Sequence, residues 1–334
     1  MNKKISVGYF AAHEQYDPST LLSHVKLAEE YGFEDIWTSD HFHPWAHTGA
    51  NNGQAWVWMG TALASTKKIK IGTAITPPGY KYHPGLIAQA WATLDYMFPG
   101  RVFIAMGTGE AMNESPLGFP WPDIKIRQNR LIEAIEIIKL LWKKDFVNYK
   151  GKYFSLNKAN LYTKPKTDIK LYVAANGPKT AYIAGNYAEG LLTLPAPLEY
   201  YKEKLFPSFE KGAKEAGKDP KKMEKVIEFI VSYDEDFDKA VESARFWGGV
   251  LVPIFFNLGI YDPRVIESVG RMISKEEIAK NWLIVTSPEE AIKKIKEYID
   301  VGFTHVQFLS SSPDEEKFIK VFGKDVIPAI KNLS

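Results

Sequence analysis

The 334-residue chain contains no cysteine, and neither sign of charge dominates it, since 42 lysine and arginine residues face 40 aspartate and glutamate residues. Without cysteine, a disulfide framework, a thiolate nucleophile, an iron–sulfur cluster and any cysteine-containing zinc site are excluded. The net charge is only +2 and the two signs are interspersed, which is not the pattern of a basic surface that binds nucleic acid. We therefore expect chemistry without sulfur and no nucleic-acid partner.

Long hydrophobic runs are also missing. The most apolar stretch, 249–260, is interrupted by Pro253 and falls well short of the roughly 20 residues that span a bilayer. The first ten residues lack the apolar core and the small-residue cleavage site of a signal peptide, and they are more typical of a first β-strand. The sequence therefore predicts a cytoplasmic protein without a membrane span.

What the chain does contain is enough apolar material for a large core, with 45% hydrophobic and 13% aromatic residues. Short apolar, β-branched runs alternate with longer amphipathic stretches. The predicted strands are 5–10, 35–38, 69–74, 102–106, 169–174, 190–194, 226–232 and 305–309, and the predicted helices are 18–31, 54–66, 84–97, 124–143, one starting at Pro178, 198–216, 236–247 and 313–331. Eight such units predict an α/β fold of the (β/α)8 or TIM-barrel type.

A barrel of this type takes about 250 residues, so the surplus is expected in insertions within a single domain that spans 1–334. Three segments break the rhythm: 111–123, the hairpin-like 146–164, and 249–300. A doubly wound dinucleotide-binding fold is the alternative, because Gly107-Thr108-Gly109 follows a predicted strand. Met112 stands where the third glycine of that fingerprint is required, and the motif does not follow the first strand, so the barrel is favoured.

In TIM barrels the active site lies at the C-terminal ends of the strands. The segments that follow the first four predicted strands are rich in carboxylate, imidazole and indole side chains: His13–Gln15, Ser39–His47, Thr76–Pro78 and Gly107–Asn113. We expect these side chains, which come from four different strands, to converge on one face of the barrel.

The pair His41 and His43 has the spacing of two metal ligands in hydrolase barrels. A metal site would need further ligands from later strands, yet the only histidine after residue 83 is His305, at the N-terminal end of the last strand. No catalytic metal is expected. Histidine and carboxylate then remain as acid and base, which suits proton transfer that accompanies a hydride step.

Two loops of small residues follow predicted strands, Gly107–Gly109 and Ala174–Pro178. They are either tight turns or places where the backbone approaches a large planar or phosphorylated cofactor. In the second loop, Gly177-Pro178-Lys179 opens a predicted helix, whose amide groups and dipole can hold a phosphate.

Taken together, several motifs resemble the luciferase-like barrels that bind the deazaflavin coenzyme F420, in particular F420-dependent alcohol and sugar-phosphate dehydrogenases. The motifs are Gly8–Gln15, Ser39–Trp45, Tyr82–Pro84 with Ile87–Gln89, Pro99–Val102, Gly107–Glu114, Gly177–Pro178 and Arg245–Trp247. The resemblance runs from about residue 5 to 330, and the combination of Asp40–Trp45 with Gly107–Glu114 is specific. It implies a homodimer and a cofactor that takes up hydride, coenzyme F420, with FMN as the alternative.

The resemblance also implies roles for matched residues. His41 would exchange the proton of the substrate hydroxyl, and Trp45 would donate its indole N–H to the developing carbonyl oxygen. Glu110 would deliver a proton to the deazaflavin ring, with Glu14 nearby. An imidazole with an ordinary pKa near 6.5 suits the first role, and an indole that only donates suits the second. The implied cofactor-binding residues are Asp40, Ala74, Ile75, Gly107, Thr108, Gly109, Asn113, Gly177 and Pro178, with a non-proline cis peptide between Ala74 and Ile75.

The expected substrate is a small, mostly apolar secondary alcohol that is oxidised reversibly to a ketone. The sugar-phosphate branch binds phosphate with two lysines and an arginine, and alignment places neutral residues there: Pro197, Asn257 and Asn281. The apolar segments 191–197 and 250–256 either form plain core or line the mouth of the site. Three alternatives stay open: a sugar or sugar-6-phosphate dehydrogenase, an FMN-dependent luciferase-like monooxygenase, and a non-catalytic binder of a cofactor or ligand.

Overall fold

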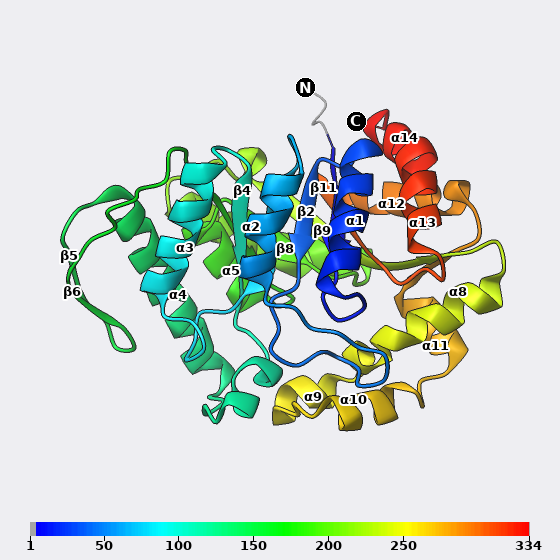
Figure 1. Ribbon diagram of the computed structural model, residues 1–334, viewed down its shortest axis with the longest axis horizontal. Helices are drawn as coiled ribbons and strands as arrows, with labels where there is room; N and C mark the ends of the chain where they lie inside the picture. Colours follow the sequence, from blue (N-terminus) through cyan, green and yellow to red (C-terminus); the bar gives the residue numbers. More distant parts are fainter. Residues whose placement is uncertain (1–4, 334) are drawn as a thin grey trace.

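A closed barrel of eight parallel strands forms the centre of the computed structural model, which describes residues 5–333. The strands are buried along most of their length, as expected for parallel strands that helices cover on the outside (Figure 1). In order around the barrel they are β1 (Ser6–Ala11), β2 (Asp35–Thr38), β3 (Lys70–Thr76), β4 (Val102–Met106), β7 (Lys170–Ala174), β8 (Gly190–Thr193), β9 (Glu224–Tyr233) and β11 (His305–Ser310). The predicted (β/α)8 barrel is confirmed.

The long strand β9 closes the barrel because it pairs with both β8 and β11. Its first residues pair with β8, starting with Glu224 opposite Gly190, and its middle pairs with β11. Its last residues pair with β10 (Leu283–Val285), a short extra strand outside the barrel. The sequence analysis did not predict β10, because three residues are too few to show an alternating pattern.

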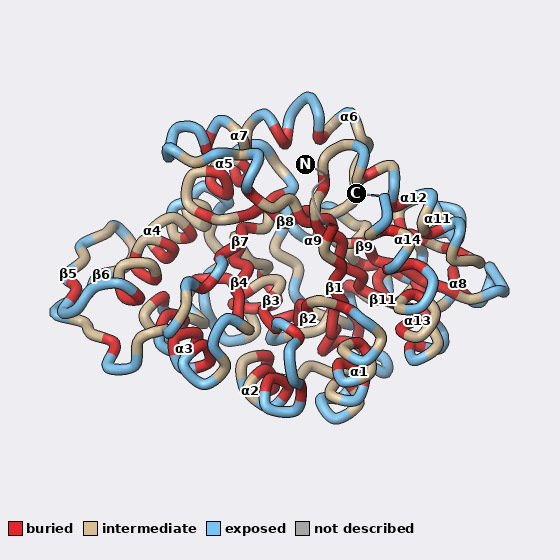
Figure 2. Tube along the Cα trace, turned by 90° about the horizontal axis from the view of Figure 1, so that it is seen from above, coloured by how far each residue is buried: buried red, intermediate tan, exposed pale blue. Residues whose placement is uncertain are grey.

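Helices surround the strands on the outside, as the view along the barrel shows (Figure 2). Aspartate side chains begin several of them; Asp17 accepts hydrogen bonds from the first amide groups of α1, and Asp123 does the same for α4. Among residues 5–333, no helix is both long and apolar enough to cross a membrane. The helices are α1 (Pro18–Glu30), α2 (Ala55–Ser65), α3 (Pro84–Met97), α4 (Ile124–Lys143), α5 (Pro178–Tyr187), α6 (Leu198–Tyr200) continued by a π-turn into α7 (Phe206–Glu215), α8 (Phe237–Ala244), α12 (Pro288–Val301), α13 (Glu315–Val321) and, after another π-turn, α14 (Ile327–Lys331).

Aromatic and charged side chains fill the N-terminal end of the barrel interior. The rings of Trp37 and Tyr172 pack with their centres 5.1 Å apart. Beside them, His305 Nε2 lies 3.0 Å from Asp35 Oδ1, and His305 Nδ1 lies 3.6 Å from Glu224 Oε2. This packing leaves the C-terminal end of the barrel for ligands, as the architecture requires.

Segments 111–123 and 146–164 both depart from the regular alternation. The first forms two single 3-10 turns, η1 (Ala111–Asn113) and η2 (Ser115–Leu117). The second is an antiparallel hairpin of β5 (Val147–Lys150) and β6 (Ser155–Ala159), which projects from the body at the left of Figure 1. The predicted hairpin is therefore present.

The segment 249–300 divides into two parts with different positions. A 3-10 turn, η5 (Arg245–Leu251), leads into α9 (Pro253–Leu258), α10 (Pro263–Gly270) and α11 (Lys275–Asn281). Helix α9 lies beyond the C-terminal ends of the strands, at the bottom of Figure 1, and in Figure 2, which looks down from the opposite end, it lies behind the centre of the ring of strands, so it crosses the barrel mouth. The last part, α12, instead covers the barrel wall, where Tyr298 packs edge-on against Phe229 of β9.

Candidate active site

A cavity of about 1070 Å³ opens at the C-terminal end of the barrel, and Phe256 of α9 contributes to its lining. Its apolar floor includes Phe10, Ile230 and Leu309, which come from β1, β9 and β11. Ten of the residues expected at the site line it: Glu14, His41, Trp45, Ala74, Ile75, Thr108, Gly109, Glu110, Gly177 and Pro178. Sequence positions as far apart as 14 and 178 are therefore brought to one cavity by the ends of the strands.

His41 lies between two carboxylates on the cavity wall. Its Nδ1 is 2.6 Å from Glu14 Oε1, and its Nε2 is 2.9 Å from Glu110 Oε2. The indole ring of Trp45 lies at the edge of the imidazole, with ring centres 6.3 Å apart. All four side chains are brought together from three loops. Glu14 follows β1, His41 and Trp45 follow β2, and Glu110 follows β4.

The carboxylates change the acid–base behaviour of His41. Burial alone would lower the pKa of the imidazole, but the negative charges of Glu110 and Glu14 outweigh burial and raise it to about 10. In turn, burial would raise the pKa of Glu14, while the His41 charge and hydrogen bonds from His41 and Ser39 hold it below its usual range. The sequence analysis took an ordinary pKa for His41, whereas the two carboxylates beside it hold this pKa well above that value.

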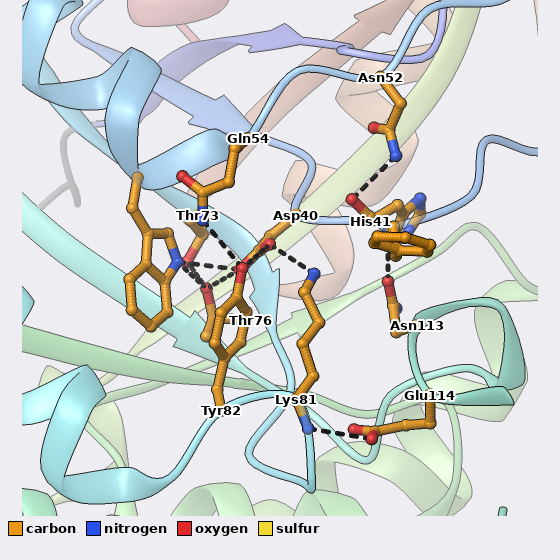
Figure 3. Close-up of polar contacts among 12 residues, drawn as sticks. Asp40, His41, Asn52, Gln54, Thr73, Thr76, Lys81, Tyr82, Asn113 and Glu114 are labelled. Atoms are coloured by element: carbon orange, nitrogen blue, oxygen red, sulfur yellow. Dashed lines mark hydrogen bonds and ion pairs between the residues drawn. The ribbon is translucent and has the colours of Figure 1, made fainter. Parts of the chain in front are cut away.

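Neighbouring polar groups hold the His41 loop in place. Ser39 Oγ donates a 2.7 Å hydrogen bond to Glu14 Oε2, which leaves Glu14 Oε1 for the imidazole. Asn52 Nδ2 donates to the carbonyl oxygen of His41 at 2.9 Å, and Asn113 Oδ1 accepts from the amide of Phe42 at 2.8 Å (Figure 3). Asn113, expected at the cofactor, is thus buried behind the loop and does not line the cavity.

Asp40 is likewise buried behind the cavity wall, at the centre of a polar network (Figure 3). Its Oδ1 accepts from Lys81 Nζ at 3.1 Å and from Tyr82 OH at 3.0 Å. Its Oδ2 accepts from Trp56 Nε1 at 2.9 Å and from Thr76 Oγ1 at 2.8 Å. These donors occupy the acceptor positions of the carboxylate, so in this structure Asp40 ties three segments of chain together rather than facing the cavity.

The cavity wall at the ends of β3 and β4 shows why glycine is required at two of the expected positions, Gly107 and Gly109. The peptide bond between Ala74 and Ile75 is cis, as predicted. A Cβ atom at Gly107 would lie 2.4 Å from Ile75 Cδ1, so glycine is needed there although Gly107 itself does not line the cavity. Gly109 has a φ of +73°, which favours glycine, and its carbonyl accepts a 3.2 Å hydrogen bond from Arg127 Nη1 of α4.

At the other end of the cavity, the N-terminus of α5 is open. Gly177 caps the helix without a side-chain hydrogen bond, and a Cβ atom at this position would meet nothing within 4 Å. Lys179 and, from α4, Lys125 line the same end. Free amide groups beside two lysines form a site suited to a phosphate or carboxylate group.

Several residues that line the cavity were not among the expected site residues; Glu228 of β9 is the charged one on a strand, and Trp247 of η5 was part of a quoted motif but had no role assigned to it. A signal for Glu228 was available, because it shares one face of a strand that was predicted to be buried with the apolar residues Val226 and Ile230. The three residues aligned with the phosphate-binding cations, Pro197, Asn257 and Asn281, do not line the cavity. Among the described residues, no group of three or more histidine, aspartate or glutamate side chains is arranged to hold a metal ion.

The open end of this parallel barrel thus combines a histidine, two carboxylates and a helix N-terminus suited to an anion. Residues 5–305 match the family model described as luciferase-like monooxygenase, and the chain belongs to this luciferase-like family. The family resemblance predicted from the motifs is confirmed.

Within the family, the chain is similar to solved and curated proteins over almost its whole length. A structure of an F420-dependent secondary alcohol dehydrogenase in complex with an F420–acetone adduct is 45% identical, with a TM-score of 0.95, and the match covers 98% of this chain and 99% of that one. The coenzyme F420-dependent tetrahydromethanopterin reductase from Methanopyrus kandleri is 28% identical, with a TM-score of 0.80, and the match covers 98% and 99%. Among curated relatives, the F420-dependent glucose-6-phosphate dehydrogenase of Beutenbergia cavernae is 38% identical over 328 residues, 98% of each chain.

Proposed function

We propose that this protein is a coenzyme F420-dependent dehydrogenase that transfers a hydride between a small secondary alcohol and the deazaflavin. The observation that carries the proposal is His41 held between Glu14 and Glu110 on the wall of a large cavity, in a chain 45% identical to a secondary alcohol dehydrogenase that uses F420.

The residues around the cavity fit this cofactor. Coenzyme F420, when bound, supplies a deazaflavin ring that accepts a hydride. Ala74, Ile75 and the turn at Thr108 and Gly109 offer a flat backbone wall to the ring. The open N-terminus of α5 with Lys179 offers amide groups and a positive charge to the phosphate of the tail.

His41 and Glu110 together handle the protons. At neutral pH the pair holds one proton, which can lie on His41 Nε2 or cross 2.9 Å to Glu110 Oε2. In the second arrangement, His41 is a neutral base that can take the proton of an alcohol, while Glu110 is an acid that can release its own. The pair again holds one proton after both transfers, so turnover leaves its charge unchanged. Glu14 keeps His41 oriented through Nδ1.

Trp45 and the apolar wall favour a small alcohol. The indole of Trp45 can only donate, so it suits an oxygen that becomes a carbonyl. Beyond it lie Trp247, Val250 and Phe256, which bring mostly apolar surface to the cavity. The segment 250–256 thus contributes to the cavity, as one of the two open interpretations of the sequence expected.

A sugar-6-phosphate dehydrogenase is the second candidate, because the curated relative at 38% identity carries that activity. The two lysines that line this cavity, Lys125 and Lys179, lie beside the N-terminus of α5, which we assign to the cofactor. A phosphorylated substrate would then lack charge-assisted hydrogen bonds worth roughly 1.5–3 kcal/mol each.

An anaerobic absorbance assay with oxidised F420 separates the candidates. Bleaching of the cofactor is expected with 2-propanol and larger secondary alcohols but not with glucose or glucose 6-phosphate. Bleaching with glucose 6-phosphate alone would favour the second candidate. Oxygen consumption with reduced FMN would favour a monooxygenase, and tight F420 binding without any turnover would favour a non-catalytic binder. The homodimer and the cytoplasmic location stay predictions.

A further inference from the structure

Glu228 is a carboxyl group on the cavity wall for which the proposed reaction has no role. It lies in the middle of β9, directly opposite Gln307 of β11, and both side chains point into the barrel. Gln307 Nε2 donates a 2.5 Å hydrogen bond to Glu228 Oε2. Within residues 5–333, Glu228 Oε1 has no hydrogen-bond partner, and Glu228 forms no ion pair. One oxygen is therefore held, and the other is free toward the cavity.

The surroundings of Glu228 favour its protonated, neutral form. The titratable groups that face it are Glu14, Glu110 and His41, from the loops after β1, β4 and β2, and the single cation among them already bridges the other two carboxylates. The neighbouring strands bring uncharged side chains to the cavity: Gln307 of β11 pairs with Glu228, and Leu309 of β11 and Leu192 and Thr193 of β8 line the cavity. Burial first, and then the negative charges of Glu110 and Glu14, raise the pKa of Glu228 to about 8.

A neutral carboxyl differs from a carboxylate because it carries an O–H donor. Gln307 can pair with either form, since a carboxamide has a donor at one end and an acceptor at the other. A carboxylic acid kept neutral in an apolar site is a known means of donating a hydrogen bond to a ligand oxygen. With Oε2 held by Gln307, Oε1 is the oxygen that remains to carry the proton and donate it to a ligand in the cavity.

We propose that Glu228 is a further ligand-binding residue of this site, held by Gln307 and donating a hydrogen bond from Oε1 to a carbonyl oxygen of the bound cofactor or substrate. The assignment rests on the proposed function, because both a deazaflavin ring and a ketone carry such an oxygen. It adds a neutral donor to the charged pair of His41 and Glu110.

Two variants with different hydrogen-bonding capacity test the assignment. Glu228→Leu cannot donate, whereas Glu228→Gln keeps an N–H donor without a titratable proton. We expect Glu228→Leu at pH 7 to weaken ligand binding about tenfold, and Glu228→Gln to recover part of this loss. Fluorescence titration gives the Kd for F420, and initial rates with 2-propanol give KM and kcat. A change in Kd for F420 would show that the carbonyl oxygen that accepts this hydrogen bond belongs to the cofactor. A change in KM or kcat at constant Kd would show that it belongs to the substrate.

The pH dependence supplies a second readout. Binding by the wild type should weaken between pH 7 and pH 9, as Oε1 loses its proton, and this weakening should be absent in Glu228→Gln. If folded Glu228→Leu binds F420 and turns over 2-propanol like the wild type, the assignment is overturned. The same holds if Glu228→Gln keeps the alkaline weakening in full.

Infrared spectra of the free enzyme keep the test independent of activity and of the folding of Glu228→Leu. The difference spectrum of the wild type minus Glu228→Gln at pH 7 should show a protonated carboxyl C=O band that disappears by pH 10; the subtraction removes the contribution of Glu315, whose pKa is raised by burial to about 7 in both proteins. Absence of this band at pH 7 would mean that Glu228 is ionised, and the assignment would fail even if the alcohol is oxidised. Conversely, a titrating band in an enzyme that never reduces F420 would leave a neutral Glu228 in place and overturn the proposed function.

Discussion

His41 Nε2 and Glu110 Oε2 lie 2.9 Å apart on the wall of the cavity, close enough to share a single proton. The second imidazole nitrogen is held by Glu14, which fixes the ring with its Nε2 toward Glu110. This geometry turns an ordinary histidine and an ordinary glutamate into a coupled acid and base. The first two predictions test that coupling.

Replacing His41 by asparagine should lower kcat for 2-propanol by about 10²- to 10⁴-fold, the usual contribution of a general base. The affinity for F420 should change far less, because His41 acts on the substrate proton. Stopped-flow reduction of F420 and fluorescence titration measure the two quantities. His43→Asn is a matched control, since His43 contacts the Tyr261 carbonyl and does not line the cavity. Equal turnover in His41→Asn and the wild type would contradict the account.

Replacing Glu110 by glutamine should lower the pKa of His41 from about 10 toward neutrality. Burial lowers this pKa, and after the substitution only the charge of Glu14 opposes burial. Histidine signals in NMR spectra, assigned with His41→Asn, follow the titration directly. The variant should also lose most of its turnover, because the acid is missing. A His41 titration unchanged by the substitution would show that the two groups are not coupled.

The Asp40 network should contribute strongly to stability. Asp40→Asn leaves the nearly buried ammonium of Lys81 without its charge partner, which typically costs 3–5 kcal/mol. Lys81→Met in the Asp40→Asn background should recover part of this loss, because no isolated charge is then buried. Urea unfolding of the two single variants and the double variant gives the coupling free energy. Strictly additive losses would show that the ion pair contributes nothing.

The ion pairs of His305 with Asp35 and Glu224, at the N-terminal end of the barrel interior, predict a loss of stability at alkaline pH. Burial lowers the pKa of His305, but the charges of Asp35 and Glu224 outweigh burial and raise it to about 9. The contribution is therefore fully present below about pH 6.5 and is lost as the pH rises through 9, with a size on the order of 3 kcal/mol. Unfolding curves at pH 6 and pH 10 measure it, and His305→Gln should remove the difference. An identical pH dependence in both proteins would rule out this source.

The sequence predicted those site residues whose position follows from the end of a strand, and it did not predict features that depend on side-chain packing. Glu14, His41, Glu110 and Gly177 follow strands with clear apolar patterns, and a barrel necessarily brings the ends of its strands together. Side-chain direction is a different matter. Asp40 is adjacent to His41 in sequence, yet it points away to Lys81 and Thr76, a choice that only packing decides.

The pKa of His41 was equally out of reach, because it depends on carboxylates placed to within a few tenths of an ångström. Glu228 could have been found, since a charged residue on the inward face of a buried strand needs an explanation. Its partner Gln307 lies 79 positions away, and only the register of β9 and β11 identifies it.

The central claim is that hydride passes from the carbon of a secondary alcohol to F420. Turnover under anaerobic conditions with 2-propanol that carries deuterium on its second carbon tests it, with mass spectrometry of the reduced cofactor. The account predicts one deuterium atom in each reduced molecule, and none when the deuterium is on the methyl groups. Reduced cofactor that contains only solvent hydrogen, or no reduction by any secondary alcohol, would contradict it.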